Sequence, residues 1–257
     1  MIESIDQARI NQLVRNCGRT ILEFPRKELQ ILSQFDENKK SNLDLLISNL
    51  LTDGLLKILD VPVISEEDAT HNETDRPYVY WLIDPIDGTR SYLEGFHTYV
   101  TQIALMSAGQ PIMSAVYAPA LNDLYTASKG KGALKNGHQI PKSTRVAPIS
   151  IIDNYPAPGI SLQQIMSDMS ISKYIECGSI GLKICKVSDG SADLFIKDTR
   201  VHDWDIAPGD LILSEAGGRL GLKDAKPYQY WESFRKEGLI ATATSEIFEL
   251  CISRFKL

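Results

Sequence analysis

Two carboxylates stand three residues apart, directly after an apolar run, within Asp84-Pro85-Ile86-Asp87-Gly88-Thr89. The run itself, residues 78–83, is aromatic and β-branched and has the length of a buried strand, so both carboxylates are expected where a strand ends. Two neighbouring carboxylates repel each other and resist burial unless a cation lies between them. Because the ligand atoms are all oxygens, the favoured cation is a hard one such as Mg²⁺. The alternative is an Asp-Pro turn followed by an Asp-Gly turn that binds nothing.

Two further acidic motifs stand on either side of this stretch. Ser65-Glu66-Glu67-Asp68 precedes it, and Trp204-Asp205-Ile206-Ala207-Pro208-Gly209 follows it. The three motifs in this order resemble the signature set of the inositol monophosphatase superfamily, from about Ile10 to the C-terminal helix. Members of that family hydrolyse small phosphate monoesters with Mg²⁺, so the resemblance implies a metal-dependent phosphatase that is sensitive to lithium.

The resemblance also implies a set of metal ligands. Glu66 and Asp84 would share one Mg²⁺ with the backbone carbonyl of Ile86. Asp84, Asp87 and Asp205 would share a second, and two or three ions in total can activate a water and neutralise a phosphoryl group. Without the resemblance, Glu66 is equally compatible with a solvated acidic loop and Asp205 with a helix N-cap ahead of a proline.

A threonine and another carboxylate complete the expected catalytic group. Gly88 and Thr89 are expected to begin a helix whose free N–H groups bind the phosphate. The hydroxyl of Thr89 can accept a proton from the attacking water if a carboxylate orients it, with Glu66 as the other partner of that water. Ser41-Asn42-Leu43-Asp44 resembles the family's Thr-x-x-Asp motif, which makes Asp44 the orienting residue. Two lysines precede it where the family often has Pro and Val, and the alternative is a first-turn acid favoured by the helix dipole.

Two residues are expected to bind the rest of the substrate. The segment Gly178-Ser179-Ile180-Gly181-Leu182-Lys183 resembles Gly-Ser-Ser-Leu-Lys in the CysQ-like branch of bacterial 3'(2'),5'-bisphosphate nucleotidases. Lys183 could therefore meet a second phosphate as a point charge, the alternative being an exposed helix lysine. Asp203 matches a family position that contacts a substrate hydroxyl.

The expected substrate is thus 3'-phosphoadenosine 5'-phosphate or a similar bisphosphate. An inositol monophosphatase or a broader sugar-phosphate phosphatase is the second candidate. A family member that binds protein or RNA with a vestigial site belongs to a different class, and the complete carboxylate set argues against it.

Composition limits the possible partners. The chain has 257 residues and a net charge of -6, which disfavours binding to nucleic acid because phosphate backbones demand a basic surface. An anionic metabolite remains a suitable partner if metal ions supply the positive charge. The 4 cysteines show no CxxC spacing and are expected to be buried free thiols, as in a reducing, cytoplasmic compartment. No stretch approaches 18 apolar residues, so we expect no membrane span; peripheral membrane association and a homodimer stay open.

Periodicity predicts the elements that position these residues. Helical spacing of apolar residues indicates helices at 10–21 and 43–59, and a strand is expected at 61–64. An antiparallel series of strands is expected at 98–106, 111–117 and 124–127, followed by a hairpin turn at Asn136-Gly137. Later helices are expected at 162–169, 181–188, 205–215 and 246–255, with strands at 193–196 and 239–243.

Helices and strands occur in both halves of the chain, which indicates a layered α/β fold. The family resemblance implies an αβαβα sandwich of the inositol monophosphatase and fructose bisphosphatase type, with the site between the halves. We expect residues 1–147 to form an N-terminal α+β part and residues 148–257 a C-terminal α/β part. Together they would make one compact catalytic unit.

Overall fold

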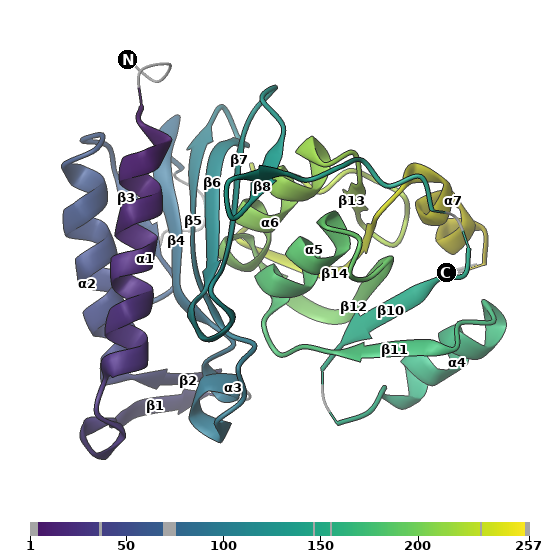
Figure 1. The fold of residues 1–257 in the computed structure, drawn as a ribbon, viewed down its shortest axis with the longest axis horizontal. Helices are drawn as coiled ribbons and strands as arrows, with labels where there is room; N and C mark the ends of the chain where they lie inside the picture. The colour runs from purple at the N-terminus through teal and green to yellow at the C-terminus, as the bar shows by residue number, and fades with distance from the viewer. Residues whose placement is uncertain are drawn as a thin grey trace.

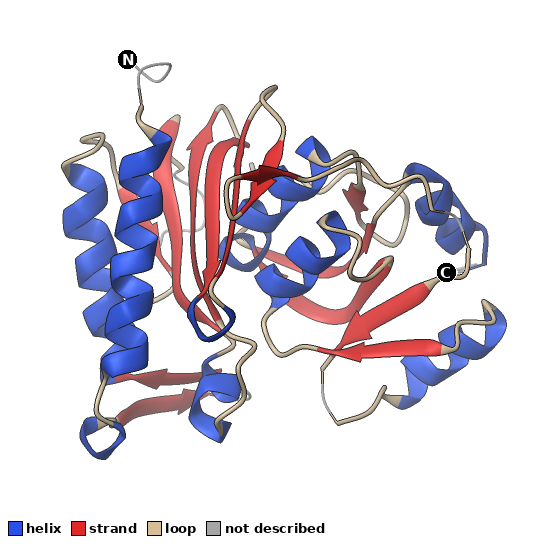
Figure 2. Cartoon of the chain, in the orientation of Figure 1, coloured by secondary structure: helices blue, strands red, loops and turns tan. Residues whose placement is uncertain are grey.

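The computed structural model describes residues 5–35, 38–68, 76–145, 147–154, 156–231 and 233–254. Within these residues, helices and sheets alternate in five layers (Figures 1 and 2). A helix pair is followed by a seven-stranded sheet, a second helix pair, a five-stranded sheet and an outer pair of helices. The αβαβα sandwich implied by the family resemblance is therefore confirmed.

The first layer contains α1 (Gln7–Glu23) and α2 (Asn42–Leu56). Asp6 caps α1, since its side chain accepts a hydrogen bond from the backbone N–H of Ala8. The buried stripe of α1 lies at helical spacing and packs on the sheet, as the sequence predicted. The second helix ends three residues before its predicted end.

The seven-stranded sheet has the order β3-β4-β5-β6-β7-β8-β9. Its strands are β3 (Val63–Ser65), β4 (Val79–Asp87), β5 (Val100–Ser107), β6 (Gln110–Ala118), β7 (Asp123–Ser128), β8 (Ala133–Lys135) and β9 (His138–Gln139). Only β3 and β4 pair in parallel, and the remaining strands form the expected antiparallel series. Asn136 and Gly137 both have positive φ, at 51° and 81°, as a two-residue hairpin turn of this kind requires.

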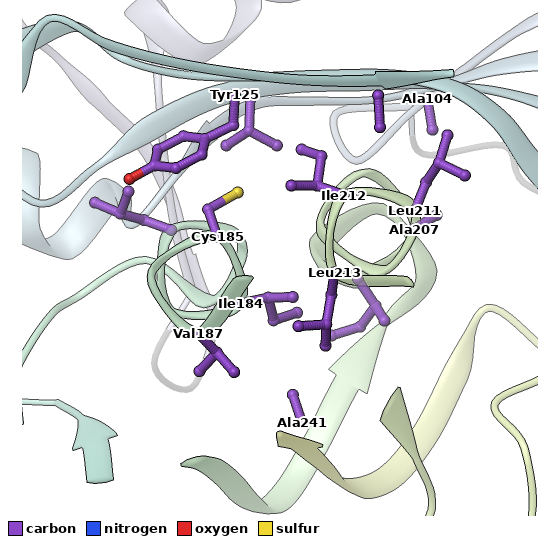
Figure 3. Close-up of a cluster of buried hydrophobic side chains, with 14 of the residues drawn as sticks. Ala104, Tyr125, Ile184, Cys185, Val187, Ala207, Leu211, Ile212, Leu213 and Ala241 are labelled. Carbon is purple, nitrogen blue, oxygen red and sulfur yellow. The ribbon is translucent and has the colours of Figure 1, made fainter. Parts of the chain in front are cut away.

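The middle layer consists of α5 (Ile180–Ser188) and α6 (Asp203–Glu215). Figure 3 shows their apolar side chains between Ala104 and Tyr125 of the seven-stranded sheet on one side and Ala241 of the five-stranded sheet on the other. Both helices are therefore covered on two faces, and few of their positions reach solvent. The sequence placed the start of α6 at Asp205, two residues late.

The five-stranded sheet has the order β11-β10-β12-β14-β13. Its strands are β11 (Lys173–Glu176), β10 (Ser150–Asp153), β12 (Leu194–His202), β14 (Arg235–Thr242) and β13 (Arg219–Gly221). The outer helices are α4 (Ile160–Asp168) and α7 (Ser245–Arg254). Smaller elements are β1 (Ile31–Phe35), β2 (Asn38–Ser41), α3 (Thr89–Glu94) and the 3-10 turns Arg26–Glu28 and Pro119–Leu121. The hairpin of β1 and β2 was not predicted from the sequence.

Two sequence-based expectations concern the whole chain. All four cysteines are buried and carry free thiols, as their spacing indicated. No helix in the described ranges combines the length and the apolar character needed to span a bilayer.

Candidate active site

A β-bulge at the end of β4 brings two carboxylates to one face of the sheet. Asp84 lies opposite Gln102 of β5, and Asp87 lies opposite Val100, so β4 holds one residue more than its partner over this interval. Side chains alternate between faces along a regular strand, and residues three apart would point to opposite sides. The extra residue of the bulge changes this alternation, so that the side chains of Asp84 and Asp87 point to the same face. Both carboxylates consequently face the helix layer formed by α5 and α6.

Asp84 is the most strained of these carboxylates. Asp84 is 1% exposed, and its oxygens receive no N–H or hydroxyl hydrogen bond from the described residues; the carboxyl group of Glu66, when protonated, is the neighbour that can donate to it. Burial raises the pKa of Asp84 well above its ordinary value, and the nearby carboxylates of Glu66 and Asp87 raise it further. A buried acceptor pair without donors is costly unless a cation binds it.

Asp87 is held by the beginning of α5. It accepts hydrogen bonds from Ser179 Oγ at 2.6 Å, from the backbone N–H of Gly181 at 2.6 Å and from that of Ile180 at 3.2 Å. Burial raises the pKa of Asp87 to about 6, with a further contribution from the charge of Asp205, although the three donors oppose the shift. The sequence had assigned the segment around Ser179 to substrate binding, so its role in orienting Asp87 was missed.

Asp205 comes from the first turn of α6. Its carboxylate accepts a hydrogen bond from the backbone N–H of His202 at 3.0 Å, so it closes a capping box at the helix start. The ring of His202 stacks on that of Trp204 with centroids 4.8 Å apart, which fixes the entry to the helix. One carboxylate oxygen of Asp205, one of Asp84 and one of Asp87 all lie within 4.8 Å of one another.

A proline inside α6 helps to attach this helix to the sheet. Pro208 has no N–H, so it cannot donate the helical hydrogen bond to the carbonyl of Trp204 four residues earlier. That carbonyl accepts a hydrogen bond from Gln102 Nε2 at 3.1 Å. Gln102 is fully buried and lies opposite Asp84 in the sheet, so one side chain links the strand of Asp84 to the helix of Asp205. The role of Gln102 was not visible in the sequence, although a proline within a helix signals a free carbonyl.

Glu66 reaches the same region from the neighbouring strand. Ser65 of β3 pairs with Ile83 of β4, and the backbone N–H of Glu66 donates to the carbonyl of Ile83 at 3.2 Å. Burial raises the pKa of Glu66 well above its usual range, and Asp205 and Glu67 raise it further. Glu66 is therefore near enough to the cluster for its charges to act on it, although the ligand oxygens that lie within 4.8 Å of one another belong to Asp84, Asp87 and Asp205.

Asp44 and Thr89 lie together as the family motif implied. Asp44 is 1% exposed and accepts hydrogen bonds from the backbone N–H and hydroxyl of Ser41, which caps α2. Its other oxygen lies 3.3 Å from Thr89 Oγ1, and that hydroxyl is also 2.8 Å from the carbonyl oxygen of Ile86. Burial raises the pKa of Asp44. Gly88, with φ of 88°, turns the chain into α3 directly before Thr89.

Lys183 is fully buried on α5 in this structure. Its ammonium lies 3.1 Å from Asp153 Oδ1 and 2.6 Å from Asn154 Oδ1, over the ring of Phe195. Burial lowers the pKa of Lys183, whereas the charge of Asp153 opposes that shift. The alternative of an exposed helix lysine is therefore wrong, because the helix is covered by sheets on both faces.

Asp203, expected at a substrate hydroxyl, is also engaged by protein groups. It accepts a hydrogen bond from the hydroxyl of Tyr228 at 2.8 Å and pairs with Arg76 at 2.7 Å. The guanidinium of Arg76 lies 3.7 Å from the ring centroid of Phe234. In this structure Asp203 thus joins the start of α6 to the segments around Arg76 and Tyr228.

The donor set fits a hard divalent cation. Asp84, Asp87 and Asp205 offer only oxygens, and the orphaned oxygens of Asp84 lie among them. Such a set suits Mg²⁺, and it contains none of the thiolate or imidazole ligands that favour softer metals.

Comparison with known proteins gives the same result as the motifs. The sequence model that describes the inositol monophosphatase family matches residues 8–256 of this chain. The 3'(2'),5'-bisphosphate nucleotidase CysQ of Escherichia coli K12 is 32% identical over 244 residues, covering 90% of this chain and 96% of that protein.

Two solved structures share the fold. The extragenic suppressor protein SuhB of Bartonella henselae superposes with a TM-score of 0.84 at 24% identity, covering 97% of this chain and 98% of that one. An IMPase of Thermotoga maritima superposes with a TM-score of 0.80 at 23% identity, covering 95% of this chain and 93% of that one. These two structures show the fold, whereas the family model over residues 8–256 and the 32% identical relative show that the chain belongs to the inositol monophosphatase family and is a phosphatase.

Proposed function

We propose that this protein is a Mg²⁺-dependent phosphomonoesterase whose substrate is a 3'(2'),5'-bisphosphate nucleotide such as 3'-phosphoadenosine 5'-phosphate. The observation that carries the proposal is the orphaned carboxylate of Asp84. It is buried, receives no N–H or hydroxyl hydrogen bond from the described residues and lies within 4.8 Å of ligand oxygens of Asp87 and Asp205. Such an arrangement is built for a cation, because without one it only destabilises the fold.

Five residues would hold two or three Mg²⁺ ions. These are the carboxylates of Glu66, Asp84, Asp87 and Asp205 and the backbone carbonyl of Ile86. When bound, the ions would neutralise the phosphoryl oxygens and favour ionisation of the attacking water. The hydrogen bonds from α5 to Asp87 and from His202 to Asp205 preset the ligand geometry, which reduces the reorganisation that binding requires.

Thr89 and Asp44 would handle the proton of the attacking water. The single hydroxyl proton of Thr89 can go to the carbonyl of Ile86 or to Asp44. When the hydroxyl of Thr89 donates to Asp44, a lone pair of Oγ1 is free to accept a hydrogen bond from the water, so a proton lost by the water would pass to Oγ1 while the hydroxyl proton of Thr89 passes to Asp44. The N–H groups of Gly88 and Thr89 are the groups we assign to the phosphate oxygens.

The nucleotide preference is supported by the relationship to a bisphosphate nucleotidase and by a cation in the matching segment. In the proposed complex, a second phosphate replaces Asp153 as the partner of Lys183. Asp153 is 21% exposed and lies at the end of β10, and because Lys183 is fully buried, a phosphate would reach its ammonium only if Asp153 moved aside. Contact between Asp203 and a substrate hydroxyl would likewise require Asp203 to exchange one of its present partners.

A phosphate-release panel tests the proposal. About twenty small phosphate esters, including 3'-phosphoadenosine 5'-phosphate and inositol 1-phosphate, are assayed with Mg²⁺ and with excess chelator. We expect turnover only with metal and the highest kcat/KM for the bisphosphate. Turnover in chelator would contradict the metal assignment, and preference for inositol 1-phosphate would establish the second candidate. Absence of turnover on every ester would favour a non-catalytic binding role.

Lys183→Met tests the substrate assignment while keeping most of the side-chain volume. A charge-assisted contact is worth roughly 1.5–3 kcal/mol, so kcat/KM for the bisphosphate should fall about ten- to a hundredfold. The value for a monophosphate should change much less, because that substrate has no second phosphate. Equal losses on both substrates would make Lys183 a structural partner of Asp153.

A further inference from the structure

A cavity lies along α6, away from the carboxylate cluster. It has a volume of about 410 Å³ and is lined by the β5–β6 turn at residues 109–111, by Asp210, Leu211, Ser214 and Glu215 of α6 and by residues 227–231. Asp205 stands in the first turn of the same helix, and Asp210 follows five residues later, about 7.5 Å further along the axis. The volume is within the range of small-molecule sites, roughly 300–1,000 Å³.

The polar groups of this cavity are mainly negative. Asp210 accepts a hydrogen bond from the hydroxyl of Tyr230 at 2.7 Å, and its other carboxylate oxygen has no donor among the described residues. Glu215 accepts from the backbone N–H groups of Gly130 and Gly132, which fixes its carboxylate on the wall. The carboxyl end of α6 adds a partial negative charge. Lys129 also lines the cavity, but its ammonium donates to Gln110.

Aromatic rings form the opposite wall. Tyr228 and Tyr230 are buried with ring centroids 5.0 Å apart, and Trp231 beside them is 53% exposed. Trp231 packs directly on the backbone of Gly109, where an added Cβ would be 2.1 Å from the indole. Because Gly109 has no side chain, the indole of Trp231 can lie directly on the backbone of the β5–β6 turn. Aromatic faces attract cations, most strongly when the cation is partly desolvated.

We infer that this cavity binds a small organic cation, an ammonium group on an aromatic or alkyl body. The ammonium would donate to the free oxygen of Asp210, and the body would pack against the exposed indole of Trp231. An anion is disfavoured because Asp210, Glu215 and the helix end would repel it. This site does not depend on the proposed phosphatase substrate, and its ligand is not a phosphate.

Benzylamine is a suitable probe, with benzyl alcohol as its uncharged counterpart of similar shape. Binding is measured at pH 8 by calorimetry and by the fluorescence of Trp231, since the other two tryptophans are buried. We expect benzylamine to bind at least about tenfold more tightly than benzyl alcohol. Equal affinity of the two compounds, or no binding of either, would overturn the inference without any variant being needed.

Asp210→Asn removes the charge and keeps an acceptor for Tyr230. Its affinity for benzylamine should fall about tenfold or more. Asp168→Asn is the matched control, because it removes the same charge from the exposed end of α4. An unchanged affinity in the Asp210 variant, or an equal loss in the Asp168 variant, would contradict a specific contact. The phosphatase rate at saturating substrate provides a check that both variants are folded.

Discussion

Replacement of Asp87 by Asn should make the metal-free protein more stable and the enzyme nearly inactive. Asp87 is 7% exposed, and its pKa is raised from 3.8 to about 6, first by burial and then by the charge of Asp205. A carboxyl group with a raised pKa binds its proton more tightly in the folded state. It therefore contributes most to stability at low pH, and this contribution is lost as the pH rises from about 4 to 6.

The size of the effect follows from this shift. Each pKa unit corresponds to 1.36 kcal/mol, so the ionised carboxylate costs folding about 3 kcal/mol above pH 6. Asn can still accept from Ser179 and Gly181, but its amide would face the N–H of Ile180, which loses a hydrogen bond worth about 1 kcal/mol. We expect a net gain of about 1–2 kcal/mol, or roughly 2–8 °C in melting temperature for a domain of this size.

The assay compares wild type and Asp87→Asn by thermal melting in excess chelator at pH 8 and near pH 4, and again with Mg²⁺ at pH 8. The variant should be more stable than wild type only in chelator at pH 8. Near pH 4 the advantage should vanish, because Asp87 is then protonated in the folded wild type. With Mg²⁺ the wild type should gain the larger stabilisation, since ligand binding to the folded state raises its stability. With Mg²⁺, the kcat of the wild type should exceed that of Asp87→Asn by at least about 10²-fold.

Two results would refute this reasoning. If the variant were less stable than wild type in chelator at pH 8, then the hydrogen bonds to Asp87 would outweigh its strain and the cluster would not need a cation. If Mg²⁺ stabilised both proteins equally and turnover were near normal, Asp87 would not be a ligand. Asp168→Asn again serves as a control, because its exposed carboxylate should affect neither stability nor kcat.

Three further measurements test the surrounding residues. Thr89→Ala should lower kcat by about 10²–10⁴-fold, whereas Thr89→Ser keeps the hydroxyl and should retain most activity, as a phosphate-release assay would show. Gly181→Ala places a Cβ 2.0 Å from Gln102 Oε1, so melting should reveal a loss of roughly 1–3 kcal/mol, and an unchanged melting temperature would contradict the packing. Ca²⁺ in place of Mg²⁺ should lower kcat through its looser geometry, and Li⁺ should inhibit; full activity with either ion would count against the metal assignment.

Much of this site could be predicted because its acids stand at the ends of recognisable elements. The apolar run before Asp84 predicts a buried strand, and the hydrophobic pattern before Gly217 predicts the helix that carries Asp205. Ser41 and Asp44 form a capping box, which is a local pattern of sequence. Each of these signals spans a few residues, and local backbone rules are sufficient to interpret them.

The partners of the acids could not be predicted in this way. Ser179 and Gly181 bind Asp87 across more than ninety positions of sequence, and they meet it only because α5 packs on the face to which the bulge turns that carboxylate. The pattern of α5 did carry a signal for the burial of Lys183. The neighbouring Leu182, Ile184 and Cys185 are not restricted to one stripe, which is typical of a helix covered on both faces. A lysine in such a helix requires a buried partner, but the sequence does not say that the partner is Asp153.

Pro208 shows how a local rule and a distant contact combine. A proline inside a helix normally weakens it, and from the sequence alone it would be taken as a helix-start signal displaced by a few residues. Here the carbonyl that it frees accepts from Gln102, the residue opposite Asp84, so the missing helical bond is replaced by a bond between the two elements that carry the acids. Because α6 is buried on both faces, water could not satisfy this carbonyl, and a donor from the sheet is required. The proline therefore contributes to the alignment of Asp205 with Asp84. A residue with a backbone N–H at position 208 could bond the carbonyl of Trp204 within the helix, and the hydrogen bond from Gln102 would then no longer be needed.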